Sequence, residues 1–135
     1  MFASTHQASP SDEVRTVMMW PVAVTTCQAT MREVAESLAA DEIGVLPVTA
    51  NGTIVGIVSE RDVVRHLGAG ADPEHLTAED IMTTDMIKVA LQTSIAEVAR
   101  VMVEAGVRHL PVLDGDAIAG IVSARDALGV LARKP

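Results

Sequence analysis

The clearest candidate chemistry lies in a heptapeptide that the chain contains twice. Gly-Ile-Val-Ser-x-Arg-Asp occurs at 56–62 and at 120–126, each time after an apolar run typical of a strand and before a helix-forming segment. Amides at such a helix start, together with the serine hydroxyl, can bind a phosphate oxygen. Three residues on, an ionised aspartate offers acceptor oxygens that suit the vicinal hydroxyls of a ribose. The pattern therefore favours nucleotide binding at Ser59 with Asp62 and at Ser123 with Asp126.

The same residues also have a purely structural interpretation. A serine followed three residues later by an acidic residue caps a helix, which contributes about 1 kcal/mol and needs no ligand. The duplication favours the ligand interpretation, because many other residue pairs would cap equally well, yet glycine, serine, arginine and aspartate all recur. Arg61 and Arg125 either contact phosphate or remain hydrated, and the sequence leaves both alternatives open.

Composition narrows the function classes. The chain has 135 residues, the size of one compact body, and 49% of them are hydrophobic, but only 1% are aromatic. The net charge of -8 is opposite to the basic surface that nucleic acid requires. The single cysteine, Cys27, fits a reducing compartment, and no apolar run is long enough to span a membrane. We expect a cytoplasmic protein that binds neither nucleic acid nor membrane.

A repeat with an offset of 64 residues extends well beyond the heptapeptides, pairing Pro21 to Leu67 with Asp85 to Leu131. Each copy is predicted to form a strand, a helix, two strands joined by a tight turn, and a helix. The predicted strands are 22–25, 45–48 and 54–58 in the first copy and 86–89, 110–113 and 118–122 in the second; helices begin at the capping boxes 30–33 and 94–97 and at Ser59 and Ser123. This element order predicts an α+β fold.

The repeat also sets the expected domain boundaries. We predict a mobile tail over 1–14, a first domain over 15–70 and a second over 71–135. Because a three-stranded unit of this size covers its apolar sheet poorly, the two copies should pack sheet to sheet about a pseudo-twofold axis. Pro47 and Pro111 within strands indicate edge positions or a bulge.

No catalytic constellation stands out. The residues that could hold a metal, Cys27, His66 and His75, lack ligand spacing, and the chain has no nucleophile elbow and no phosphate-binding P-loop. We therefore expect a protein that is not an enzyme and has no metal site.

The duplicated Leu-Pro-Val, turn and Gly-Ile-Val-Ser-x-x-Asp pattern resembles a tandem pair of CBS domains, the Bateman module, from about Arg15 to about Leu131. The resemblance implies a regulatory module that binds AMP, ADP, ATP or S-adenosylmethionine in clefts between the two domains and commonly forms a homodimer. It implies ribose binding by Asp62 and Asp126 and phosphate contacts by Ser59 and Ser123. An adenine nucleotide would then be a regulatory ligand and no cofactor would be obligatory.

The resemblance further implies that each cleft takes its adenine pocket from the other copy. The Asp126 cleft would use Met19, Val24, Ile43 and Gly44, and the Asp62 cleft would use Thr83, Lys88, Val107 and Arg108. Phosphate contacts are expected from Arg61, Lys88, Arg108 and His109. Thr83 and these cations favour the Asp62 cleft. Signalling would occur in trans, on an unknown effector protein; the alternative is a ligand-free dimeric scaffold or stress-response interaction protein.

Overall fold

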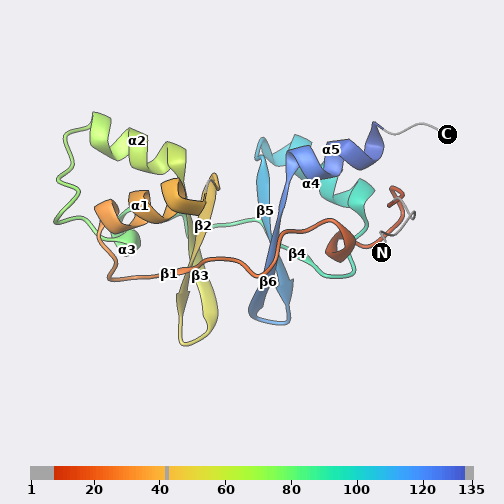
Figure 1. The fold of residues 1–135 in the computed structure, drawn as a ribbon, viewed down its shortest axis with the longest axis horizontal. Coiled ribbons are helices and arrows are strands. Elements are labelled where there is room, and N and C mark those ends of the chain that lie inside the picture. The colour runs from red at the N-terminus through yellow and green to blue at the C-terminus, as the bar shows by residue number, and fades with distance from the viewer. Residues whose placement is uncertain (1–7, 42, 133–135) are drawn as a thin grey trace. The chain divides into compact units, whose positions relative to one another are not determined.

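The two copies of the repeat fold into the same succession of elements (Figure 1). The computed structural model describes residues 8–41 and 43–132. The first copy contains β1 (Thr25–Thr26), α1 (Met31–Asp41), β2 (Val45–Ala50), β3 (Thr53–Ser59) and α2 (Glu60–Gly68); the second contains β4 (Val89–Ala90), α4 (Ile95–Ala105), β5 (His109–Asp114), β6 (Ala117–Ser123) and α5 (Ala124–Leu131). A 3-10 turn, η1 (Val14–Thr16), precedes the first copy, and α3 (Ala78–Ile81) lies between the copies.

Each copy forms a three-stranded sheet, in the order β1-β2-β3 and β4-β5-β6. Helices α1 and α2 lie on one face of the first sheet, and α4 and α5 lie on one face of the second (Figure 1). The α+β prediction is therefore confirmed. The outer strands β1 and β4 begin later and are shorter than the predicted 22–25 and 86–89, because only two residues of each pair in parallel with the central strand.

The turn between β2 and β3 forms as predicted, with φ of 54° at Asn51 and 79° at Gly52. Of the two alternatives predicted for Pro47, the edge position is wrong, because β2 is the middle strand, whereas the bulge agrees with the irregular pairing of β2 and β3 next to it. Pro47 is tolerated there because the parallel pairing with β1 begins only at Val48, so no ladder partner needs an amide from the proline. A register shift follows at once, between Val48 and Thr49.

The helix starts follow the predicted capping boxes. The Thr30 amide donates to the Glu33 carboxylate at 2.8 Å, and the Glu33 amide donates to the Thr30 hydroxyl at 3.1 Å. In the second copy only half of the box forms: the Glu97 amide donates to the Ser94 hydroxyl, while the Glu97 carboxylate pairs with Arg100. An arginine one turn on thus competes successfully for a capping carboxylate.

The chain divides into two compact units that do not coincide with the two copies. Among the described residues, the Ser59 unit holds 22–41, 43–87 and 116–118, and the Ser123 unit holds 8–21, 88–115 and 119–132. The segment that precedes each copy therefore belongs to the other copy's unit. The buried core of the Ser59 unit includes Met31, Val34, Leu46 and Val58, and that of the Ser123 unit includes Val14, Ile95, Leu110 and Val122.

The described part of the expected mobile tail is anchored. Residues 1–7 lie outside the described residues, but Val14 is completely buried and its amide donates to the Thr93 carbonyl at 2.7 Å. The Ile95 amide donates to the Asp12 carbonyl, and the Ala96 amide donates to the Pro10 carbonyl, both at 2.9 Å. Residues 10–14 thus satisfy amides at the start of α4 that have no partner inside the helix.

Candidate functional site

Both predicted serine and aspartate pairs lie where an edge strand passes directly into a helix. Ser59 ends β3 and Ser123 ends β6, each in an extended conformation that places its hydroxyl over the first helical turn. The Asp62 amide donates to the Ser59 hydroxyl at 3.1 Å, and the Asp126 amide donates to the Ser123 hydroxyl at 3.0 Å. The structure therefore brings together each predicted pair, and both serines are N-caps.

In the first copy the aspartate is fully engaged by its own helix. One oxygen of the Asp62 carboxylate accepts from the Ser59 amide at 2.8 Å and from the Ser59 hydroxyl at 2.9 Å. The other accepts from the Arg65 guanidinium at 2.5 Å. Asp62 is only 6% exposed. The Asp62 carboxylate, expected to bind a ribose, and the Ser59 hydroxyl, expected to bind a phosphate, are therefore hydrogen-bonded to each other.

In the second copy the aspartate is left open. The Asp126 carboxylate is half-buried and makes no hydrogen bond or ion pair with any residue that the structure describes. The position equivalent to Arg65 is Gly129, so no guanidinium is available one turn further along α5. Arg65 is a site residue that sequence reasoning missed. Its signal was present, since an arginine three residues after Asp62 aligns with a glycine in the second copy.

The glycine of each heptapeptide allows another backbone to approach closely. A Cβ added at Gly56 would lie 2.9 Å from Met82 Cγ and 3.1 Å from the Thr83 carbonyl oxygen. Thr83 and Ile57 exchange hydrogen bonds of 2.9 and 3.0 Å. This bridge adds the segment before the second copy to the outer edge of β3.

The same arrangement recurs at Gly120, where Met19 and Ile121 exchange backbone hydrogen bonds of 2.8 and 3.1 Å. A Cβ added at Gly120 would lie 2.8 Å from the Met19 carbonyl oxygen. Thr83 is therefore brought to the strand that leads into Ser59, and Met19 to the strand that leads into Ser123. Both placements agree with the pairing expected from the sequence.

The remaining predicted residues fall into the two units as follows. Val24, Ile43, Gly44 and Thr83 belong to the Ser59 unit, whereas Met19, Lys88, Val107, Arg108 and His109 belong to the Ser123 unit. The Gly44 carbonyl accepts from the Glu60 amide at 3.0 Å, and the Arg108 carbonyl accepts from the Ala124 amide at 2.7 Å. Gly44 thus lies at the start of α2, and Arg108 at the start of α5.

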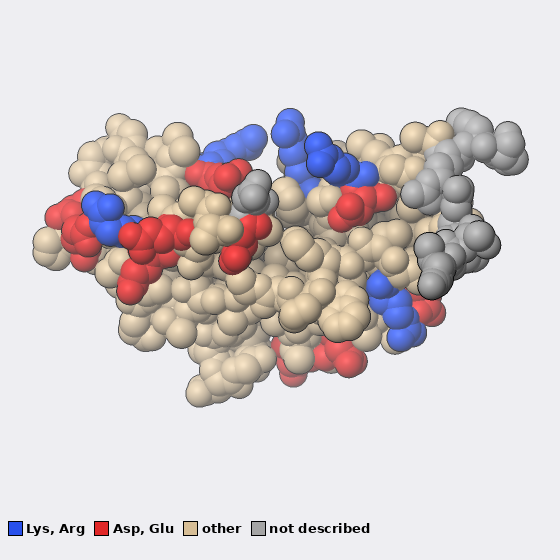
Figure 2. Space-filling view, viewed as in Figure 1, with Lys and Arg blue, Asp and Glu red and all other residues tan. Residues whose placement is uncertain are grey.

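The cations near the two helix starts are exposed. Arg61 and Arg125 lie on the first turns of α2 and α5, and neither makes an ion pair within the described part of the chain. Figure 2 shows Lys and Arg atoms next to Asp and Glu atoms at several places on the face in view, with uncharged surface between them. The positive charge available to an anionic ligand is therefore local rather than spread over the surface.

Of the three candidate metal ligands of the sequence, His66 and His75 have other partners, and Cys27 is a free, half-buried cysteine. His66 Nδ1 lies 2.8 Å from the Asp62 carbonyl oxygen, and His75 Nδ1 lies 2.5 Å from the Asp72 carboxylate. Among residues 8–41 and 43–132, no three His, Cys, Asp or Glu side chains are grouped to hold a metal ion. No helix in the same ranges is long and apolar enough to cross a membrane.

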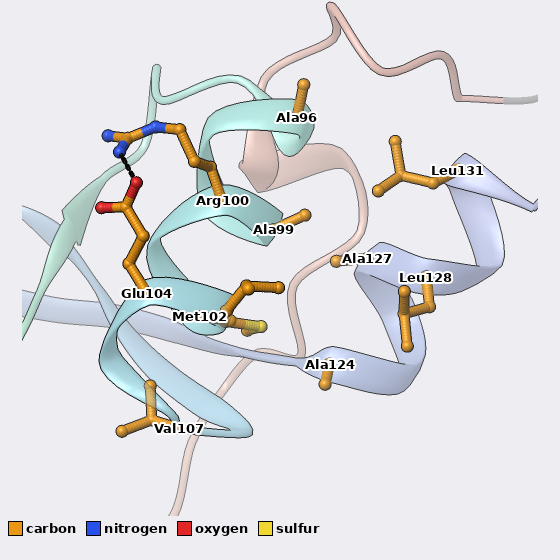
Figure 3. A pocket seen from close by; sticks show the side chains of 11 residues that line it. Ala96, Ala99, Arg100, Met102, Glu104, Val107, Ala124, Ala127, Leu128 and Leu131 are labelled. Atoms are coloured by element: carbon orange, nitrogen blue, oxygen red, sulfur yellow. Dashed lines mark hydrogen bonds and ion pairs between the residues drawn. The ribbon is translucent and has the colours of Figure 1, made fainter.

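A separate apolar groove lies between α4 and α5 of the Ser123 unit (Figure 3). Its volume is about 540 Å3, and neither Ser123 nor Asp126 lines it. An ion pair between Arg100 and Glu104 lies at one side of the groove. The other lining residues are mainly small and aliphatic: Ala96, Ala99, Met102, Val103, Val107, Ala124, Ala127, Leu128 and Leu131. This surface is suited to apolar contact rather than to a nucleotide.

Together, the repeated sheet with its flanking helices and the capped Ser-x-x-Asp junction define an α+β tandem-repeat protein with two equivalent candidate ligand sites. The family model of the CBS domain matches the chain twice, at residues 14–69 and 78–133. The chain therefore belongs to the CBS domain family, and as a tandem pair it is a regulatory module.

Relatives and solved structures agree with this assignment. The chain is 37% identical over 106 residues to an uncharacterised 33.4 kDa protein of Thermofilum pendens, covering 77% of this chain but only 34% of that protein. Hypoxic response protein 1 of Mycobacterium tuberculosis is 32% identical over 99 residues, covering 72% of this chain and 69% of that protein. The CBS domain pair of protein MJ0100, solved with 5-methylthioadenosine and S-adenosylmethionine, has a TM-score of 0.83 and 25% identity, covering 90% of this chain and 97% of that chain.

Proposed function

We propose that this CBS pair is a non-enzymatic sensor that binds an adenosyl ligand, namely AMP, ADP, ATP or S-adenosylmethionine, and signals to a partner protein in trans. The observation that carries the proposal is the open Asp126 carboxylate beside the capping hydroxyl of Ser123. Adenosyl ligands in the MJ0100 pair support the choice of ligand class.

The chemistry of the site suits binding rather than catalysis. A ribose can donate both vicinal hydroxyls to the Asp126 carboxylate, and the Ser123 hydroxyl can donate to a phosphate oxygen while it accepts from the Asp126 amide. The exposed side chain of Arg125 adds positive charge on the same helical turn. We assign Arg61, Lys88, Arg108 and His109 to phosphate contacts, with Ser59 only when its hydroxyl is released from Asp62. Met19, Val24, Ile43, Gly44, Thr83 and Val107 are assigned to the adenine pockets.

We also propose that the module acts as a homodimer whose helices provide the contact. Leu128 on α5 is 58% exposed, and its equivalent in the first copy, Val64 on α2, is 67% exposed. Both repeats therefore expose an apolar side chain at the same helical position. A second molecule of this chain would cover these side chains, because a symmetric dimer buries the same surface of each partner. Analytical ultracentrifugation tests this: the wild type should sediment as a dimer, and Leu128→Arg should sediment as a monomer if the contact is correct.

Ligand binding is tested by calorimetry and thermal melting of the full chain with AMP, ADP, ATP and S-adenosylmethionine. A ligand at about 100 times its dissociation constant should stabilise the wild type by about 2.7 kcal/mol. The double variant Asp62→Ala/Asp126→Ala should melt at the same temperature with and without ligand. Asp116→Ala is the matched control, because it removes an exposed carboxylate of equal charge from a hairpin turn.

The alternative is a ligand-free dimeric scaffold or interaction protein. The capping role of both serines favours it, since a cap explains their presence without a ligand. If no ligand of the panel shifts the melting of the wild type while the protein remains dimeric, the scaffold is the correct description and the sensor is not.

A further inference from the structure

The two Ser-x-x-Asp sites are identical in motif but opposite in state. In the first, the Asp62 carboxylate holds three donors: the Ser59 amide, the Ser59 hydroxyl and the Arg65 guanidinium. An ionised carboxylate has about four acceptor positions, so little of its capacity remains. The Ser59 hydroxyl donates its proton to the Asp62 carboxylate, so it cannot at the same time donate to a phosphate oxygen.

A ribose would have to displace these donors to bind Asp62. Arg65 and a ribose would both donate to an ionised carboxylate, but the guanidinium also carries a full positive charge, whereas ribose hydroxyls are neutral donors. The Arg65 side chain is 61% exposed, so it can move away, but the Asp62 side chain that it covers is 9% exposed. Arg65 therefore competes directly with a sugar for the carboxylate oxygen that Ser59 does not occupy.

The second copy lacks this competitor. Gly129 occupies the position equivalent to Arg65, and a Cβ added there would meet no atom within 4 Å, so the site has open space where the arginine side chain would begin. The Asp126 carboxylate and the Ser123 hydroxyl proton have no mutual bond in the part of the chain that the structure describes. Both groups are available to a ligand without rearrangement.

We propose that Arg65 is a specificity-determining residue that closes the Asp62 site to ribose, so that the chain binds one adenosyl ligand tightly, at Asp126. This inference rests on the proposed function and adds to it the number and location of the tight sites. It reverses the preference for the Asp62 site that Thr83 and the nearby cations indicate. An Asp62 carboxylate that is already bonded lowers ribose affinity more than Thr83 and the cations raise it.

Calorimetry of the full chain with AMP as the probe tests the proposal through stoichiometry. The wild type should bind one equivalent tightly, and Arg65→Ala should bind a second equivalent at least about tenfold more tightly than the wild type binds a second one. The reciprocal variant Gly129→Arg should weaken the tight site by about tenfold, because it places an arginine at the same spacing from Asp126. Arg32→Ala is the control, since it removes an exposed arginine of the same unit that pairs with Glu74, away from the site.

Two further variants separate the sites and guard against misfolding. Asp126→Ala should abolish tight binding in the wild type and leave intact the site gained in Arg65→Ala. Arg65→Gln keeps much of the side chain without its charge and should repeat the result of Arg65→Ala, with melting curves used to confirm that each variant is folded.

The outcomes distinguish this inference from the proposed function. If AMP binds but Arg65→Ala gains no second site, or binds more weakly because the arginine contacts phosphate, the role of Arg65 is refuted and the sensor function stands. If the wild type and all variants bind none of AMP, ADP, ATP and S-adenosylmethionine, the proposed function itself is refuted, and the inference with it.

Discussion

The close backbone approach at Gly120 leads to a quantitative prediction. In Gly120→Ala the new methyl carbon would lie 2.6 Å from Met18 Sδ and 2.8 Å from the Met19 carbonyl oxygen. Carbon and oxygen normally remain more than 3 Å apart, so the bridge between Met19 and Ile121 must move. Overpacking of this kind costs typically about 1–3 kcal/mol. We expect Gly120→Ala to lower the free energy of unfolding by about 2 kcal/mol.

Gly56→Ala is the informative comparison, because a methionine sulfur is the nearest contact in both copies but the backbone carbonyl is farther away at Gly56. The added carbon would lie 2.5 Å from Met82 Sδ but 3.1 Å from the Thr83 carbonyl oxygen. Met82 can change rotamer, whereas a hydrogen-bonded carbonyl cannot, so Gly56→Ala should cost less than Gly120→Ala. The double variant Gly56→Ala/Met82→Ala should cost less than the two single changes together.

Urea denaturation followed by circular dichroism measures these differences. The control is Gly129→Ala, a helical position in open space where alanine should stabilise by up to about 1 kcal/mol. If Gly120→Ala unfolds within about 0.5 kcal/mol of the wild type, the backbone contact does not constrain this strand and the argument is wrong.

Other consequences of the structure can be measured in the same way. Ser123→Ala should cost about 1 kcal/mol of unfolding free energy, and Ser59→Ala about twice that, because it also removes a donor from a buried carboxylate; equal losses in urea titrations would argue against this. Leu110→Ala, at a position 1% exposed, should cost about 2–5 kcal/mol by the same titration. The Thr77 amide and hydroxyl hold the pKa of Asp80 below its ordinary value, so the stability that this capping box contributes is present at neutral pH and is lost as the pH falls through the lowered pKa. Acid melting curves below about pH 4 should therefore be flatter for Asp80→Ala than for the wild type.

Features that depend on neighbouring residues were predictable from the sequence. The box of Thr30 with Glu33 and the Asn51-Gly52 turn both form because their donors, acceptors and backbone angles lie within a few residues. Because the sequence is repeated, an element predicted in one copy could also be predicted at the equivalent position of the other. The approach of a backbone to Gly56 was also predictable, since only a residue without a side chain allows it.

Features set by distant partners were not predictable. The extent of β1 depends on where Thr25 meets the central strand, and no local pattern marks that point. The states of Asp62 and Asp126 differ although their motifs match: the sequence shows that Arg65 aligns with Gly129, but not that the arginine side chain turns back to pair with Asp62. Motif recognition located the candidate sites, and only the structure distinguished between them.

The exchange of leading segments between the two copies has a consequence for how the chain can be divided. A fragment cut at the repeat boundary would lose the strand that Met19 adds to β6 and would expose the backbone amides and carbonyls of that edge. Bare sheet edges are templates for intermolecular pairing. The two halves of this duplicated chain are therefore interdependent, and a single copy excised by sequence alignment would be prone to aggregate.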